Sequence, residues 1–119
     1  MKDLAPHVFR QRLLVEGLYT IELTREKLAS YLLGVAAHLD LKAYGEPVIY
    51  SPAGLGKSEN QGFDAFLPLV DSGIAAYVWS AARFFSIVLY TCKGFDEAAA
   101  IAYTREFFAA NGEIESLSF

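Results

Sequence analysis

The spacing of apolar residues between positions 24 and 40 places the strongest constraint on how this chain can fold. Apolar side chains recur there at intervals of three and four residues, which is the pattern of a helix with one buried face. They are Leu28, Tyr31, Leu32, Val35, Ala36 and Leu39. Thr24 is the candidate N-cap of this helix, and Glu26 lies in the first turn, where the helix dipole favours an acidic side chain.

Six other segments have the β-branched and aromatic composition, or the strict alternation, that is typical of strands. They cover residues 12–23, 45–50, 63–70, 74–79, 83–92 and 113–119. A tight turn is expected at Asp71, Ser72 and Gly73. A second helix is expected over residues 97–110, and it is capped at its two ends by Asp96 and Gly112.

The resulting order, β-α-β-β followed by β-β-α-β, predicts an α+β fold in a single domain, residues 1–119. Two helices are expected to cover one face of a mainly antiparallel sheet, which makes a two-layer sandwich. The second helix is expected to carry Ile101, Arg105 and Phe108 along one side. The chain is 54% hydrophobic and 14% aromatic, so apolar surface should remain after folding, and a homodimer is the expected way to cover it.

Charge and composition exclude several classes of function. The net charge is −4 and the ten Lys and Arg residues are scattered, which argues against a nucleic-acid partner. The apolar runs are too short to span a membrane, and residues 1–6 lack the apolar stretch of a signal peptide. The single cysteine, Cys92, can form no internal disulfide. These features predict a cytoplasmic protein with no membrane partner.

The glycine-rich segment of residues 51–62 is expected to be a loop that can face a ligand. It partly matches a phosphate-binding loop, but Ser51 stands where that motif needs glycine, and no helix-forming sequence follows Lys57. Nucleotide hydrolysis is therefore not expected. His7 and His38 have no ligand partners at helical spacing, so neither a metal site nor a Ser-His-Asp hydrolase is predicted.

The most specific pattern lies in residues 71–94, DSGIAAYVWSAARFFSIVLYTCKG. Ser72 follows an acidic residue in the expected turn, Trp79 ends the next strand, and Cys92 follows Thr91 twenty residues after Ser72. In these residues and intervals the chain resembles the bacterial S-adenosylmethionine decarboxylases. The first strand and helix and the last helix and strand fit the same family, whose fold is a two-layer sandwich of this kind.

The resemblance implies a self-cleaving, pyruvoyl-dependent decarboxylase of polyamine (spermidine) biosynthesis. In that family a serine attacks the preceding carbonyl, and cleavage leaves a pyruvoyl group that serves as an electron sink for decarboxylation. Transferred to this sequence, Ser72 is the precursor of the pyruvoyl cofactor, Asp71–Ser72 is the cleaved bond, and Cys92 is the proton donor. An unprocessed chain would carry no cofactor.

Several positions depart from the family pattern where its chemistry takes place. Tyr77 replaces the histidine that serves self-processing, and a phenol is a poor base at neutral pH. Asp64 replaces a serine that assists the same step. Asp71 and Gly73 replace the glutamate and the histidine that flank the cleavage serine. Ala81 replaces the glutamate associated with the substrate ribose.

Trp79, Ala81 and Arg83 are the candidate residues of a substrate pocket. Arg83 is placed to meet Asp64 or Asp71 or to bind an anionic ligand. Two of them have a simpler structural interpretation: Trp79 can belong to the core or a dimer interface, and Arg83 can be an exposed residue at the end of a strand. Considered alone, Cys92 is expected to be a buried, inert thiol.

Two functional hypotheses remain open. The first is an unprocessed, diverged member of the family that binds a small molecule in a remnant pocket around Ser72, Tyr77 and Cys92. The second is an active self-cleaving decarboxylase that acts on S-adenosylmethionine or another amino acid. A third interpretation is an unrelated ligand-binding domain that carries the motif by coincidence.

Overall fold

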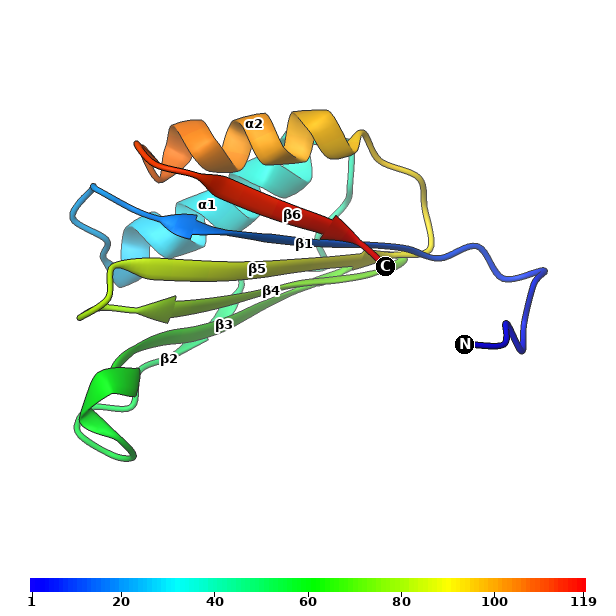
Figure 1. Ribbon diagram of the computed structural model, residues 1–119. Helices are drawn as coiled ribbons and strands as arrows, with labels where there is room; N and C mark the ends of the chain where they lie inside the picture. Colours follow the sequence, from blue (N-terminus) through cyan, green and yellow to red (C-terminus); the bar gives the residue numbers. More distant parts are fainter.

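Two helices cover one face of a six-stranded antiparallel sheet (Figure 1). The computed structural model describes residues 1–119. The strands are β1 (Gln11–Leu18), β2 (Val48–Tyr50), β3 (Gly62–Leu69), β4 (Ser72–Trp79), β5 (Phe84–Thr91) and β6 (Ile114–Ser118), and the helices are α1 (Arg25–His38), α2 (Glu97–Phe107) and the short 3-10 helix η1 (Ser58–Asn60). The strand order is β2-β3-β4-β5-β1-β6. The predicted two-layer α+β fold is confirmed.

Helix α1 follows the predicted pattern. Thr24 Oγ1 accepts a hydrogen bond from the Lys27 amide at 3.1 Å, so Thr24 is the N-cap. The whole predicted apolar stripe is buried, and it packs against the inward side chains of the sheet in one hydrophobic core. This burial stabilises the helix more than its intrinsic propensity does.

Helix α2 is shorter than predicted at its C-terminal end. Asp96 Oδ1 accepts a hydrogen bond from the Ala99 amide at 3.1 Å, which confirms the expected N-cap. The helix ends at Phe107, because Ala109 adopts a left-handed φ of 47° and carries the chain away. The prediction that Gly112 caps the helix is therefore wrong, since the left-handed turn comes three residues earlier.

The buried side of α2 consists of Ala100, Thr104 and Phe108, which are spaced four residues apart. Of the predicted side, Phe108 is buried, but Ile101 is only half-buried and Arg105 is exposed. The expected side was thus rotated by about one residue from the true one. Neither helix has the length and apolarity needed to cross a membrane.

A buried hydrogen-bonded pair joins the two helices. The hydroxyl of the fully buried Tyr31 lies 2.7 Å from Thr104 Oγ1, which itself donates to the Ala100 carbonyl at 2.8 Å. Because the Thr104 proton is used in that bond, the Tyr31 hydroxyl is the donor of the pair. Burial raises the pKa of Tyr31 well above its ordinary value, so the phenol stays neutral.

Removing either hydroxyl should lower the free energy of unfolding, by different amounts. Tyr31→Phe leaves Thr104 its bond to the Ala100 carbonyl, so we expect a loss of about 1 kcal/mol. Thr104→Val leaves the Tyr31 hydroxyl buried without its acceptor, so we expect a loss of about 2 kcal/mol. Urea unfolding followed by circular dichroism measures both losses. A greater loss for Tyr31→Phe would contradict this assignment of donor and acceptor.

The turn between β3 and β4 lies one residue earlier than predicted. It consists of Val70 and Asp71, and both Ser72 and Gly73 already belong to β4. Asp71 and Ser72 have positive φ angles of 76° and 144°, a region that favours glycine. The glycine stands instead at Gly73, where any side chain would collide with the ring of Phe66. Ser72 keeps this backbone conformation while it pairs with Leu69 on β3 and with Thr91 on β5.

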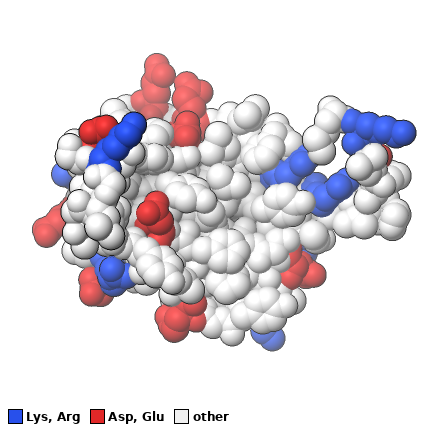
Figure 2. Space-filling view, turned by 90° about the horizontal axis from the view of Figure 1, so that it is seen from below, with Lys and Arg blue, Asp and Glu red and all other residues white.

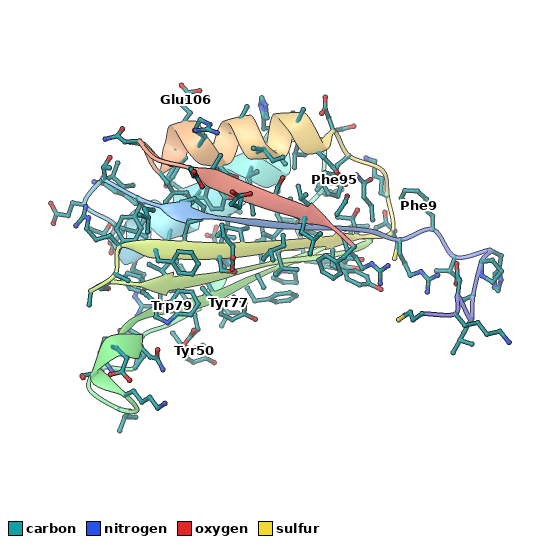
Figure 3. All side chains as sticks on the ribbon, in the orientation of Figure 1. Phe9, Tyr50, Tyr77, Trp79, Phe95 and Glu106 are labelled. Atoms are coloured by element: carbon teal, nitrogen blue, oxygen red, sulfur yellow. The ribbon has the colours of Figure 1, made fainter.

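The face of the sheet opposite the helices has no covering layer, and we call it the open face. Along β4 the side chains of Ile74, Ala76 and Val78 are buried beneath the helices, so Tyr77 and Trp79 point the other way (Figure 3). The large side chains of the open face are Leu14, Leu18, Val48, Tyr50, Phe66, Tyr77, Trp79, Phe84, Val88, Tyr90 and Leu117.

Candidate functional site

Strands β4 and β5 bring Ser72 and Cys92 together at one end of the sheet. Ser72 pairs with Thr91, so the next residue of the chain, Cys92, lies beside it. Ser72 Oγ is 3.5 Å from Cys92 Sγ. Cys92 is exposed, so the expectation of a buried thiol is wrong: the residue lies just beyond the end of β5.

Two backbone features distinguish the peptide bond between Asp71 and Ser72: a hydrogen bond to its carbonyl oxygen and positive φ angles on both sides. The Cys92 amide donates a hydrogen bond to the Asp71 carbonyl oxygen at 2.7 Å. A donor in this position stabilises negative charge on that oxygen when a nucleophile attacks the carbonyl carbon. Both residues of the bond have positive φ, which stores on the order of 1–3 kcal/mol of strain at each.

A shallow hollow of about 340 Å³ opens on the open face beside Ser72. Its walls are mostly apolar, and it is lined by Phe66, Ser72, Gly73, Ala75, Val88 and Tyr90. Such walls provide apolar contact but no charged group for a ligand. Strong binding of a polar molecule here would need groups from outside this hollow.

Arg10 also lies at this end, although no sequence pattern singled it out. The pairing of Gln11 with Thr91 brings the chain before β1 close to Cys92. Arg10 Nη2 contacts Asp3 Oδ1 at 2.5 Å, and this bond raises the pKa of Arg10. The pKa of Asp3 is lowered, first by the hydrogen bond from the Ala5 amide and then by Arg10. The guanidinium is thus engaged by a carboxylate of its own chain.

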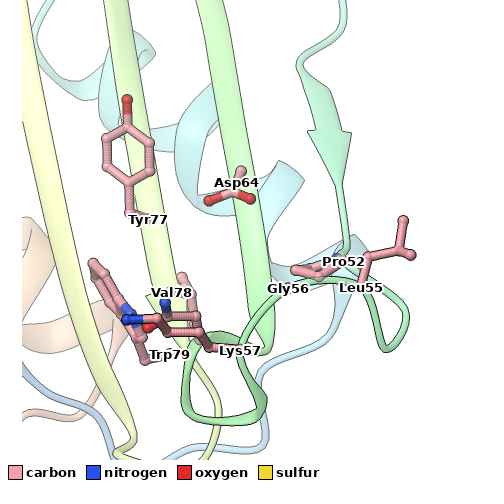
Figure 4. A pocket seen from close by; sticks show the side chains of 9 residues that line it. Pro52, Leu55, Gly56, Lys57, Asp64, Tyr77, Val78 and Trp79 are labelled. Carbon is pink, nitrogen blue, oxygen red and sulfur yellow. The ribbon is translucent and has the colours of Figure 1, made fainter.

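Asp64, Tyr77 and Trp79 form a second group, farther along β3 and β4. Asp64 pairs with Tyr77 across the two strands, and the Trp79 indole donates to Asn60 Oδ1 at 3.1 Å. A cavity of about 300 Å³ opens between this group and the loop of residues 51–61 (Figure 4). We call it the loop pocket, and it is lined by Pro52, Leu55, Gly56, Lys57, Asn60, Asp64, Tyr77, Val78 and Trp79. It therefore combines an ammonium group, a carboxylate and two aromatic side chains.

The side chain of Gln61 holds the loop together. Its amide nitrogen donates to the carbonyls of Leu55 and Lys57 at 2.8 and 3.1 Å, and its amide oxygen accepts from the Gly54 amide at 2.9 Å. The loop was predicted from its composition. The roles of Gln61, Lys57 and Asn60 were not, because they depend on the folded path of the loop.

Replacing Gln61 should loosen the loop. Gln61→Ala removes three hydrogen bonds to the backbone, so we expect trypsin to cut after Lys57 several-fold faster than in the parent chain. Glu59→Ala is a matched control, because Glu59 contacts only the Ser58 hydroxyl within the same loop. Mass spectrometry of the digest identifies the cut. Equal rates for the two variants would show that Gln61 does not hold the loop.

Within one chain, the pair of Ser72 and Cys92 lies apart from the group formed by Asp64, Tyr77 and Trp79. Ser72 and Tyr77 are five residues apart on β4, a rise of about 17 Å. Tyr77 and Asp64 line the loop pocket, whereas Ser72 and Cys92 lie at the other end of the sheet. The remnant pocket predicted around Ser72, Tyr77 and Cys92 is thus divided into two places.

Arg83 meets neither of the carboxylates expected for it. Its guanidinium donates to the backbone carbonyls of Tyr19 at 3.3 Å and Ile21 at 2.7 Å, and it lies 5.0 Å from the centre of the Tyr19 ring. These bonds hold the turn between β4 and β5 against the segment that follows β1. Ala81 lies in the exposed turn between β4 and β5 and lines neither the hollow nor the loop pocket. Of these three candidate pocket residues, only Trp79 lines the loop pocket, and none lines the hollow beside Ser72.

No group of three or more histidine, cysteine, aspartate or glutamate side chains is arranged to hold a metal ion. His38 lies at the end of α1, with its ring centre 5.1 Å from that of Tyr103 on α2. It is therefore on the helix side of the sheet, away from both groups described above.

The solved structure of the adenosylmethionine decarboxylase from Aquifex aeolicus VF5 is similar to this chain over nearly its whole length. The TM-score is 0.70 at 17% sequence identity, and the match covers 94% of this chain and 89% of that one. No family model and no curated protein matches the sequence. The likeness therefore establishes the class of fold, that of an adenosylmethionine decarboxylase. At this identity the activity has to be argued from the residues of the site.

Proposed function

We propose that this chain binds a small zwitterionic molecule in the loop pocket and remains uncleaved. The observation that carries the proposal is the composition of that pocket. Lys57 and Asp64 offer opposite charges for the carboxylate and the amine of an amino-acid-like ligand. Tyr77 and Trp79 offer aromatic surface for its apolar or planar part. A cavity of about 300 Å³ has the size of a small-metabolite site.

The surroundings of Ser72 support an uncleaved chain. Attack by its hydroxyl on the Asp71 carbonyl requires a group that takes the proton. The hydrogen-bond partner of that hydroxyl is Cys92 Sγ. Tyr77 and Asp64, which stand at the positions of the family's processing residues, line the loop pocket instead. The shared fold makes S-adenosylmethionine the first ligand to test, since it has an amino-acid group and a planar base.

Trp79, the only tryptophan of the chain, lines the loop pocket and should report binding. Titration with S-adenosylmethionine, then with other amino-acid-derived zwitterions, should change its fluorescence until it saturates. Asp64→Asn and Lys57→Ala each remove a charged partner, so each should raise the Kd about tenfold, or about 1.4 kcal/mol. Glu59→Gln changes a charge of the same loop outside the pocket and should bind as the parent does.

Two results would contradict this assignment. One is a set of titrations in which no zwitterion of this class alters the fluorescence or is detected by calorimetry. The other is saturable binding that Asp64→Asn and Lys57→Ala leave unchanged, which would place the ligand outside the loop pocket.

A second candidate function is favoured by the backbone at Ser72. This function is self-cleaving, pyruvoyl-dependent decarboxylation of S-adenosylmethionine or another amino acid. The positive φ angles of Asp71 and Ser72, and the Cys92 amide on the Asp71 carbonyl, are features that an attack by Ser72 would use. A pyruvoyl group derived from Ser72 would supply an electron sink for decarboxylation. Cys92 Sγ, 3.5 Å from Ser72 Oγ, would hold a proton at that end of the sheet.

The mass of the intact, freshly purified chain separates the two functions. The proposed function predicts a single species of full length. Self-cleavage predicts two fragments, residues 1–71 and residues 72–119, the second with a blocked N-terminus. Ser72→Ala is the control, because loss of the hydroxyl should leave the chain whole in either case. Fragments in the parent but not in Ser72→Ala would replace the proposed function with the second one.

A further inference from the structure

A further cavity lies on the helix side of the molecule, between α1 and α2. Its volume is about 410 Å³, and it is lined by His38 on α1 and by Tyr103, Glu106 and Phe107 on α2. The loop pocket and the hollow beside Ser72 are instead on the open face, which shows a wide area without charge (Figure 2). The cavity between the helices is therefore independent of the site described above.

Aromatic rings form most of the walls of this cavity, and the helix packing holds them in place. Gly34 lets Tyr103 lie against α1, because a Cβ at Gly34 would be 2.1 Å from the Tyr103 hydroxyl oxygen. The Tyr103 and Phe107 rings are nearly parallel, with an interplanar angle of 17°. The His38 ring centre lies 5.1 Å from that of Tyr103. The fully buried Tyr31 ring lies next to both α2 rings, with centres 6.1 and 5.3 Å away. The rings are thus fixed before any ligand arrives.

The charge at this cavity is negative. Glu106 projects from α2 away from the sheet (Figure 3), and it takes part in neither of the two ion pairs of the chain. Helix α1 ends at His38 and α2 ends at Phe107, so the negative ends of both helix dipoles lie at the cavity. Arg105 belongs to the same last turn of α2 but is not among the lining residues. A ligand here meets a free carboxylate and aromatic surface.

We propose that this cavity binds a small organic cation with one positive charge, of the alkylammonium or quaternary ammonium class. Aromatic ring faces attract cations, and clusters of such rings recognise methylated ammonium groups. The Glu106 carboxylate pairs with the cation at the mouth of the cavity. His38 and Glu106 are too few donors for a metal ion, and the chain holds no metal-binding group of three or more side chains. The walls therefore select an organic monocation.

Titration of the full chain with tetramethylammonium, followed by its amide NMR signals, tests this proposal. The signals of Gly34, His38 and Phe107 should shift until they saturate, with a Kd on the order of 1–10 mM for a cation held by two or three weak contacts. The neutral molecule tert-butanol has a similar shape and should bind at least about fivefold more weakly. The fluorescence of Trp79 should stay constant, because Trp79 lines the loop pocket on the open face.

Three variants and a control locate the cation. Glu106→Gln removes the carboxylate, and Phe107→Leu replaces an aromatic face with an apolar side chain, so each should raise the Kd about threefold. His38→Lys places an ammonium group of the protein beside the rings and should raise the Kd at least about tenfold. Glu26→Gln removes a carboxylate from the exposed side of α1, outside the cavity, and should bind as the parent does.

Three results would overturn the proposal. The first is a titration with tetramethylammonium in which no signal of the cavity residues shifts until it saturates. The second is equal binding of tetramethylammonium and tert-butanol, which would show that charge plays no part. The third is a Kd that both Glu106→Gln and His38→Lys leave unchanged, which would place the cation elsewhere on the chain.

Discussion

The register between β4 and β5 is the constraint on which both the core and the site depend. It turns Ile74 and Leu89 inward, where both are fully buried, and it pairs Ser72 with Thr91. A slip of one residue would move every inward side chain of a strand to the open face. Each large apolar residue exposed in this way costs about 1.5–3 kcal/mol. The contact between Ser72 and Cys92 is thus a consequence of core packing, and it would persist in a chain without any catalytic activity.

The order and type of the elements could be predicted because their signals are local. The apolar stripe of α1 and the caps Thr24 and Asp96 follow from a few neighbouring residues, and all are present in the structure. The exact turns could not be predicted in the same way. Gly73 has the composition of a turn residue, but it lies in β4, where the ring of Phe66 from the neighbouring strand occupies the space that a Cβ would take. Similarly, Ala109 takes the left-handed position that the sequence assigned to Gly112.

The site could be predicted only in part, for a related reason. Ser72 begins β4 and Cys92 directly follows the end of β5, and a short turn joins these two antiparallel strands, so the interval between the two residues in the sequence predicts their proximity. The loop pocket depends on bonds from Gln61 to distant backbone atoms, and such bonds leave no periodic signal. Tyr77 and Asp64 were expected near Ser72 because the resemblance gives them a joint role. Within one chain the rise of β4 keeps them apart.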